Sequence, residues 1–246
     1  MNMSRFFLRL IVGVFALGAT TLPTVVWANT PKSAEKPANT CQITPASAYV
    51  LGDSLAYGLK HAGLEVTLRA LLRGPQTISF DGGRSITTPG MHIKKSALES
   101  VDADAALVSA AKVIIVVLGT NIMEPNFGES QAVLMRKLRG LNPKAHYFWV
   151  DIGATMSNFT VQWSERNKTI YDNAQPLGYQ VISRYKAIFG PGADPLRIQP
   201  GLLFPGYASE PGYGGQGSVH GYDLELSQAI LDALLRHLPP APCASK

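Results

Sequence analysis

Ser54 occupies a position where a serine could act as a nucleophile. It stands in the segment Gly52-Asp53-Ser54-Leu55, directly after the apolar run 48–51. That run predicts a buried strand, and a helix that starts right after it would leave backbone N–H groups unpaired beside the serine hydroxyl. Such groups can stabilise the oxyanion that forms when a serine attacks a carbonyl carbon. Serine alone is a poor nucleophile, so this interpretation requires a base elsewhere in the chain.

Three further polar segments follow Ser54 along the chain. Gly82-Gly83-Arg84-Ser85 and Gly119-Thr120-Asn121 each come after an apolar run, and His220 precedes the last helical pattern. Together with the first segment, this set resembles the SGNH hydrolases, also called the GDSL esterase/lipase family. That family is named for a serine, a glycine, an asparagine and a histidine in four separate blocks. The resemblance spans about residues 46–238.

The resemblance implies a role for one residue of each block. Ser54 would be the nucleophile and His220 the base that activates it. The backbone N–H groups of Ser54 and Gly83 and the side-chain amide of Asn121 would bind the oxyanion, and glycine leaves the backbone open to the substrate. Taken singly, Ser54 could be a helix N-cap and residues 119–121 an ordinary turn. The four blocks in this order favour the catalytic interpretation.

The sequence departs from the family pattern beside the histidine. The family has an aspartate three residues before its histidine, and here Gly217 occupies that position. Asp223 is the first candidate for the third member of the triad, although its place before the last helical pattern is also typical of an N-cap. Asp194 and a backbone carbonyl are the alternatives, because His220 needs only an acceptor at its other ring nitrogen.

Two charged residues inside the blocks have other expected roles. Asp53 is interpreted as a structural residue that braces the turn and not as a catalytic acid. Arg84 either lies at the mouth of the site, where it would hold an anionic or hydroxyl-rich substrate, or is a solvated surface arginine.

The N-terminal residues 1–28 have the pattern of a secretory signal peptide. Arg5 and Arg9 lie before the apolar run 10–17, and Val26-Trp27-Ala28 is typical of a cleavage site. The apolar stretch is shorter than the roughly 20 residues that a spanning helix needs. We therefore expect cleavage after Ala28, a periplasmic or secreted protein, and no stable membrane anchor after cleavage.

The mature chain is expected to form one domain. Residues 29–45 lack periodicity and predict a flexible leader, residues 46–240 form the SGNH-like domain, and residues 241–246 are a C-terminal tail. The chain has two cysteines, Cys41 and Cys243, near the two ends of the mature protein. In an oxidising compartment they could form a disulfide, and the alternative is two free thiols.

Apolar runs alternate with helical patterns along this domain. Such alternation predicts a central parallel sheet with helices on both faces, which is a three-layer α/β/α sandwich of the flavodoxin-like kind. Residues 190–217, rich in glycine and proline, lead into His220 and form either a wall of the active site or a surface excursion. The expected strands are 48–51, 78–80, 113–118, 147–150 and 179–183, and the expected helices are 55–72, 101–112, 130–141, 160–177 and 224–238.

Composition excludes several other classes of function. The formal net charge is only +5, and no run of basic residues interleaved with aromatics argues for nucleic-acid binding. No metal-ligand spacing and no glycine-rich phosphate loop occurs, so we expect a mechanism without a cofactor.

The expected function is an exported serine esterase that cleaves acyl or acetyl esters of envelope glycans or lipids. The alternatives are an O-acyltransferase and a catalytically degenerate protein that binds a glycan or a partner. The partner is therefore expected to be a small-molecule, lipid or glycan ester, and the sequence gives no oligomeric state.

Overall fold

The computed structural model describes residues 46–61, 63–121, 123–153, 160–198 and 223–238. All of them belong to one compact unit of the chain. Several expectations concern residues outside this described part: the signal peptide, the leader, Gly217, His220, the C-terminal tail and the cysteines at 41 and 243.

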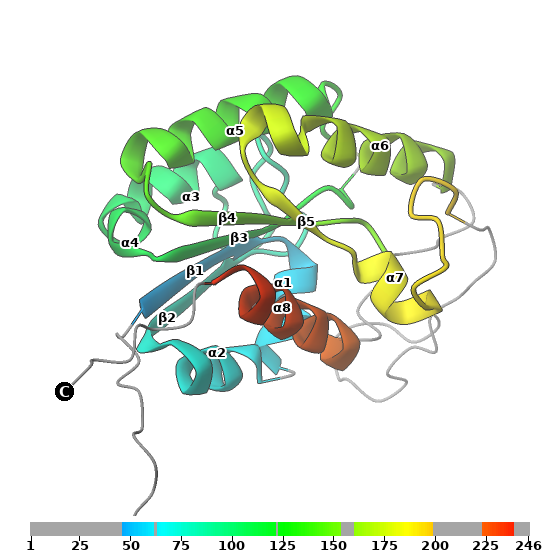
Figure 1. Cartoon of the computed structure of the whole chain (residues 1–246). Helices are drawn as coiled ribbons and strands as arrows, with labels where there is room; N and C mark the ends of the chain where they lie inside the picture. The colour runs from blue at the N-terminus through cyan, green and yellow to red at the C-terminus, as the bar shows by residue number, and fades with distance from the viewer. Residues whose placement is uncertain (1–45, 62, 122, 154–159, 199–222, 239–246) are drawn as a thin grey trace, which may run out of the picture. The chain divides into compact units, whose positions relative to one another are not determined.

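A five-stranded parallel sheet forms the centre of the unit (Figure 1). The strands lie in the order β2-β1-β3-β4-β5, and each neighbouring pair is parallel. The central parallel sheet expected from the sequence is thereby confirmed. The strands are β1 (Ala46–Gly52), β2 (Arg73–Phe80), β3 (Val113–Val117), β4 (His146–Val150) and β5 (Gln180–Ile182).

The first three strands end at the same edge of the sheet. Gly52 at the end of β1 is in register with Phe80 at the end of β2 and with Val117 at the end of β3. Segments that follow parallel strands come together at the carboxyl edge, where α/β proteins bind their ligands. In this chain those segments carry the first three of the four motif blocks.

Helices follow or separate the strands throughout the described part of the chain. The helices are α1 (Ser54–His61), α2 (Leu64–Leu72), α3 (Ala97–Ala103), α4 (Ala105–Ala110), α5 (Phe127–Leu141), α6 (Thr160–Leu177), α7 (Arg184–Phe189) and α8 (Asp223–His237).

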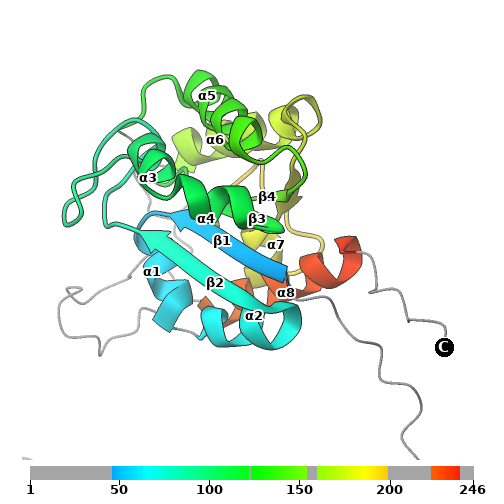
Figure 2. The same cartoon turned by 90° about the vertical axis from the view of Figure 1, so that its left-hand side faces the viewer.

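The sheet separates two hydrophobic cores, which gives three layers (Figure 1 and Figure 2). Val50 and Ile115 point to the face that α1, α2 and α8 cover, whereas Leu51 and Ile114 point to the face that α3, α4, α5 and α6 cover. All four side chains are fully buried. A central strand buried on both faces explains why β3 is a continuous apolar run.

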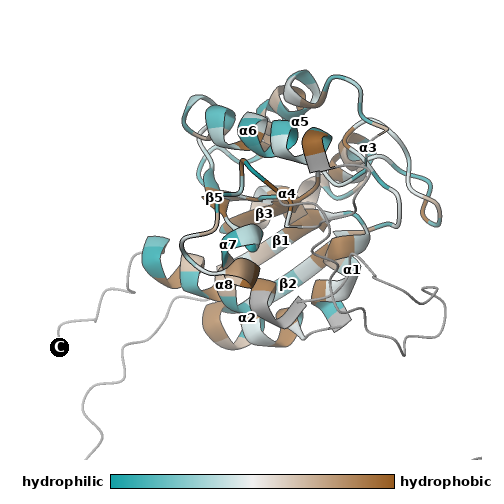
Figure 3. Ribbon diagram, turned by 90° about the vertical axis from the view of Figure 1, so that its right-hand side faces the viewer, coloured by the Kyte–Doolittle hydropathy of each residue, from teal (hydrophilic) through white to brown (hydrophobic). Residues whose placement is uncertain are grey.

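Hydropathy differs between the central strands and two of the helices that cover them. Figure 3 shows hydrophobic colour on β1 and β3 and hydrophilic colour over much of α5 and α6. None of the helices in the described part is both long enough and apolar enough to cross a bilayer.

The helix expected over residues 55–72 is divided into two. Gly63 separates α1 from α2 with a φ of 80°, a left-handed conformation that glycine adopts without steric cost. The expected periodicity holds on both sides of this residue.

The helix expected over residues 101–112 begins earlier and is also divided. The hydroxyl of Ser96 accepts the N–H of Glu99 at 3.2 Å, and the carboxylate of Glu99 accepts the N–H of Ser96 at 2.7 Å. This capping box starts α3 four residues before the expected boundary, at Ala97. Asp104 then separates α3 from α4.

Candidate active site

The turn between β1 and α1 holds Ser54 at the carboxyl edge of the sheet. Gly52 ends the strand, and a Cβ atom there would lie 2.5 Å from Cβ of Ala56 and 2.9 Å from the carbonyl oxygen of Val117. Glycine is therefore required for this close approach of strand and helix. Ser54 is the first residue of α1 and is partly exposed. A fixed backbone with an accessible hydroxyl is the combination that a nucleophilic serine needs.

Asp53, and not Ser54, caps α1. Its Oδ1 accepts the N–H of Leu55 at 2.8 Å. This is the hydrogen bond that an N-cap side chain makes to the second residue of a helix. The capping role that could have explained Ser54 therefore belongs to Asp53, in agreement with the expectation that Asp53 braces the turn.

A tight turn after β2 brings the second block to the same edge. The N–H of Arg84 donates to the carbonyl oxygen of Asp81 at 3.3 Å, and Gly83 inside the turn has a φ of 73°. Only glycine adopts this left-handed conformation readily. Among the described residues no acceptor receives the N–H of Gly83.

Asp81 fixes the loop that follows the second block. Its carboxylate accepts the N–H groups of His92 at 2.9 Å, Ile93 at 2.8 Å and Lys94 at 3.1 Å. The ring of His92 consequently stands beside Gly82, where an added Cβ would lie 3.7 Å from Nε2 of His92. The loop is thus held against the second block by a buried carboxylate.

One side-chain network joins the first three blocks. Oδ2 of Asp53 accepts the hydroxyl of Thr120 at 2.6 Å and Nδ2 of Asn121 at 3.1 Å. Nδ2 of Asn121 also donates to the carbonyl oxygen of Arg84 at 2.7 Å. The third block is therefore tied to the first through a carboxylate and to the second through a backbone carbonyl.

Burial dominates the electrostatics of Asp53. The side chain is fully buried, and this burial raises the pKa of Asp53 to about 6. Hydrogen bonds from Thr120 and Leu55 and the positive charge of Arg184 act in the opposite direction. Asp53 therefore changes its protonation state within the range in which a histidine base also titrates.

Arg84 is buried, which corrects the expectation of a solvated surface arginine. Its side chain is 1% exposed, Nε donates to the carbonyl oxygen of Lys95 at 3.2 Å, and Nη1 lies 3.4 Å from both the carbonyl oxygen of Gly52 and Oγ of Ser79. A guanidinium enclosed in this way is not solvated, and its Nη2 has no hydrogen-bond partner in the described part of the chain. The role of Arg84 in holding a substrate stays a prediction. The long side chain folds back below the turn, which residue type alone does not reveal.

Glu124, which the sequence analysis did not single out, connects the second block with α5. Its carboxylate accepts four hydrogen bonds: from Oγ of Ser85 at 2.9 Å, from the N–H and hydroxyl of Thr87 at 2.9 and 2.8 Å, and from Oγ of Ser130 at 2.6 Å. Burial would raise the pKa of Glu124, but these hydrogen bonds together lower it.

Side chains of α6 hold the third block through the backbone carbonyl groups of that block. Nη1 of Arg166 donates to the carbonyl oxygens of Gly119 and Asn121, both at 2.6 Å. Nε1 of Trp163 donates to the carbonyl oxygen of Thr120 at 3.1 Å. Three consecutive carbonyl groups are therefore fixed from α6, while the side chains of the block face Asp53.

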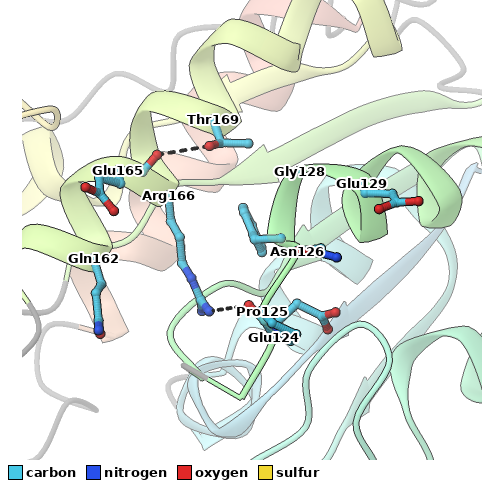
Figure 4. Close-up of a pocket in the computed structure, with 10 residues that line it drawn as sticks. Glu124, Pro125, Asn126, Gly128, Glu129, Gln162, Glu165, Arg166 and Thr169 are labelled. Carbon is cyan, nitrogen blue, oxygen red and sulfur yellow. Dashed lines mark hydrogen bonds between the residues drawn. The ribbon is translucent and has the colours of Figure 1, made fainter.

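A cavity of about 660 Å³ adjoins this support between α5 and α6 (Figure 4). The guanidinium of Arg166 points from α6 toward Glu124 and Pro125, and its Nη2 donates to the carbonyl oxygen of Glu124 at 2.9 Å. The lining is mostly polar. It consists of Glu124, Pro125, Asn126, Phe127, Gly128, Glu129, Gln162, Glu165, Arg166 and Thr169.

The unexpected helix α7 carries a buried arginine toward the site. Arg184 is its first residue and is fully buried, and its side chain passes over Gly153, where an added Cβ would lie 2.9 Å from Cγ of Arg184. The charge of Arg184 lowers the pKa of Asp53. The glycine- and proline-rich sequence after Phe189 concealed this short helix, although Ser183 is a recognisable N-cap.

The structure does not describe the proposed base. His220 and Gly217 lie outside the described residues, and Asp223 is described only as the first residue of α8. Asp194 is exposed, and its Oδ1 accepts the N–H of Leu196 at 3.0 Å within a local turn. Within the described residues no group of three or more His, Cys, Asp and Glu side chains could hold a metal ion.

Comparisons with known proteins identify the fold. No family model and no curated protein sequence matches the chain. Among solved structures, the chain is similar to the periplasmic domain of a lipopolysaccharide acetyltransferase from Salmonella ser. Paratyphi A, with 16% identity and a TM-score of 0.51 over 79% of this chain and 85% of that one. It is similar to TesA with 14% identity and a TM-score of 0.52, over 76% of this chain and 97% of that one.

A third similar structure belongs to a larger protein. An active-site mutant of a family two carbohydrate esterase from Clostridium thermocellum shares 14% identity and a TM-score of 0.50, over 79% of this chain and 65% of that one. Identities this low support a shared fold and nothing finer. The fold is that of the SGNH hydrolases, as the motif resemblance predicted.

Proposed function

We propose that this protein is a serine ester hydrolase with Ser54 as its nucleophile. The observation that supports this most strongly is the network of Asp53, Thr120 and Asn121 with the carbonyl of Arg84. It connects the turns after three different strands at one edge of the sheet. Such a convergence around an accessible serine is what nucleophilic catalysis on a carbonyl requires.

The proposed reaction has two halves. Oγ of Ser54 attacks the ester carbonyl carbon while His220 takes the hydroxyl proton, and the carbonyl oxygen becomes an oxyanion. The N–H groups of Ser54 and Gly83 and the amide of Asn121 donate to that oxyanion. The intermediate collapses, His220 returns the proton to the departing alcohol, and an acyl-enzyme remains. Water then attacks the acyl group by the same steps and regenerates Ser54.

Esterase assays with matched variants test this proposal. We expect hydrolysis of p-nitrophenyl acetate, and Ser54→Ala should lower kcat by about 10³-fold or more. His220→Ala should cause a loss of similar size. His92→Ala is the control, because His92 is a loop histidine beside the second block to which the mechanism gives no role. Equal rates in wild type and Ser54→Ala would contradict the proposal.

The group that orients His220 is open to a direct test. If Asp223 does so, Asp223→Asn should lower kcat by orders of magnitude, because a neutral amide favours the wrong tautomer of the base. If Asp223 only caps α8, the change should leave rate and stability nearly unaltered, because asparagine caps about as well as aspartate. In that case His220 is oriented by Asp194 or a backbone carbonyl, or Ser54 and His220 act as a dyad.

The substrate class is proposed as acyl or acetyl esters of envelope glycans or lipids. The alternative is an O-acyltransferase, which the similarity to the periplasmic domain of a lipopolysaccharide acetyltransferase favours. A transferase would pass the acyl group from Ser54 to a sugar hydroxyl. Adding oligosaccharide to the esterase assay and measuring acylated sugar by mass spectrometry separates the two. A degenerate binding protein, suggested by Gly217, would do neither.

Export and a Cys41–Cys243 disulfide are further proposals from the sequence. Mass spectrometry of exported protein should give an N-terminus at Asn29 and a mass two hydrogens below that of the reduced form. Free thiols in freshly exported protein would contradict the disulfide and leave the esterase proposal intact.

A further inference from the structure

The carboxylate of Asp53 faces hydrogen-bond donors on both of its oxygens. Oδ1 receives the N–H of Leu55, while Oδ2 receives the hydroxyl of Thr120 and Nδ2 of Asn121. An ionised carboxylate only accepts hydrogen bonds. Asn121 must therefore turn its nitrogen, and not its carbonyl oxygen, toward Asp53.

The second hydrogen on Nδ2 of Asn121 faces a replaceable acceptor. It donates to the neutral carbonyl oxygen of Arg84 at 2.7 Å. A substrate oxyanion carries a full charge and is a stronger acceptor than a carbonyl. It can take this hydrogen while Asp53 keeps the first one, so the amide stays aligned as charge develops on the substrate.

We propose that Asp53 is a positioning residue, whose ionised carboxylate orients the Asn121 amide for the oxyanion. This inference rests on the proposed esterase function and deepens it. Asp53 would then have two roles: it caps α1, and it acts on the reaction only by positioning Asn121.

The proposal makes the orientation of Asn121 dependent on pH. Burial raises the pKa of Asp53 to about 6. Within the described part of the chain, the charged groups that act on it are the guanidinium groups of Arg184 from α7 and Arg84 from the second block. Above this pH the carboxylate is ionised and accepts the amide nitrogen. Below it the protonated carboxyl becomes a donor and can pair with the carbonyl oxygen of Asn121, which releases the amide from its catalytic orientation.

A double-mutant cycle tests the coupling. Asparagine at position 53 has one acceptor oxygen, so its NH₂ group must face either Leu55 or the donors of the third block. We expect Asn121→Ala to lower kcat by about 10²–10³-fold, as removal of an oxyanion donor does. Asp53→Asn should lower kcat at least about tenfold with little change in KM. The double variant should be no slower than Asn121→Ala alone.

Asp151→Asn is the matched control. Asp151 is also buried after a strand, and it accepts the N–H of Tyr185 at 3.0 Å at the start of α7 together with the hydroxyls of Ser183 and Tyr171. Loss of this carboxylate should reduce stability. If it also lowers kcat, its loss and that of Asn121→Ala should multiply in the double variant, as they do for independent sites. If the losses in kcat from Asp53→Asn and Asn121→Ala multiplied in the same way in their double variant, the proposal would be overturned.

NMR gives a readout that does not require turnover. In a His220→Ala background, the side-chain amide of Asn121 should shift with pH with a midpoint near the pKa of about 6 that burial gives Asp53. The shift should vanish in Asp53→Asn and persist in Asp151→Asn. Because the first measurement needs no change at position 53, it remains decisive if Asp53→Asn does not fold. An amide that does not titrate would overturn the Asp53 role, whereas wild-type activity equal to that of Ser54→Ala would refute the esterase itself.

Discussion

At the scale of single residues, buried charged side chains hold the geometry of the candidate site. Asp53, Arg84, Glu124 and Arg166 are each at most 9% exposed, and each contacts the turn or loop that follows a strand. Buried charges of this kind are costly unless their hydrogen bonds are satisfied. Loss of one partner should therefore disturb the loops more than loss of a surface charge.

Glu124→Gln should destabilise the protein at neutral pH. Glutamine offers one acceptor oxygen, so at least one of the donors on Ser85, Thr87 and Ser130 would face an NH₂ group. We expect a loss of about 2–4 kcal/mol in the free energy of unfolding. Urea denaturation followed by tryptophan fluorescence measures it, with Glu165→Gln on the exposed side of α6 as the control.

The pH dependence of this loss follows from the lowered pKa of Glu124. A carboxylate with a lowered folded-state pKa contributes stability that is present above its unfolded pKa of about 4.3 and is lost as the pH falls through the folded value. The difference between wild type and Glu124→Gln should therefore shrink in acid. A difference that grows toward low pH would contradict the assignment.

At the scale of elements, glycines decide where helices stop and how closely they approach strands. Gly63 and Gly140 are a matched pair, because an added Cβ would meet no atom within 4 Å at either position. They differ in backbone conformation: Gly63 has a φ of 80°, and Gly140 lies within α5. Any difference between their substitutions must therefore come from the backbone.

Alanine should have opposite effects at these two positions. Gly63→Ala forces a Cβ into the left-handed region and should destabilise the protein by about 1–2 kcal/mol. Gly140→Ala removes a flexible residue from a helix and should stabilise it by about 0.5–1 kcal/mol. Thermal unfolding of both variants measures the signs, and a stabilising Gly63→Ala would show that α1 and α2 need no turn there.

At the scale of the whole unit, two separate cores flank one sheet. Neighbouring residues of β3 enter different cores: Ile114 packs on the side of α5, and Ile115 packs on the side of α8. Because both faces are covered, neither side of the strand tolerates a truncated side chain.

Ile114→Ala and Ile115→Ala should destabilise the protein by similar amounts. Each leaves a cavity in a closed core, and we expect about 2–5 kcal/mol for each in urea denaturation. Leu235→Ala on the exposed side of α8 should change stability by less than about 1 kcal/mol. A large loss for only one isoleucine would mean that one face of the sheet is open.

The sequence predicted the layers well because hydrophobic patterning is local. Residues 160–177 became α6 without a change of boundary, the run 113–118 gave β3 one residue shorter than expected, and β5 has three residues of the five expected. The short α7 was missed because its six residues directly precede the glycine- and proline-rich segment that starts at Gly190. The capping box at Ser96 was present in the sequence as Ser-x-x-Glu, so the start of α3 could have been found.

The sequence by itself determined the parallel α/β architecture and the order of the motif blocks. Hydrophobic periodicity and motif order are local properties of the amino-acid sequence and need no tertiary contacts to be recognised. Only the tertiary structure decided which polar groups meet. It buried Arg84, made Asp53 the cap of α1 and the partner of Asn121, and brought Glu124 and Arg166 against the blocks. Apart from the cap of α1, which joins Asp53 to Leu55, these contacts join residues tens of positions apart. Their strength depends on burial, which no single segment of sequence contains.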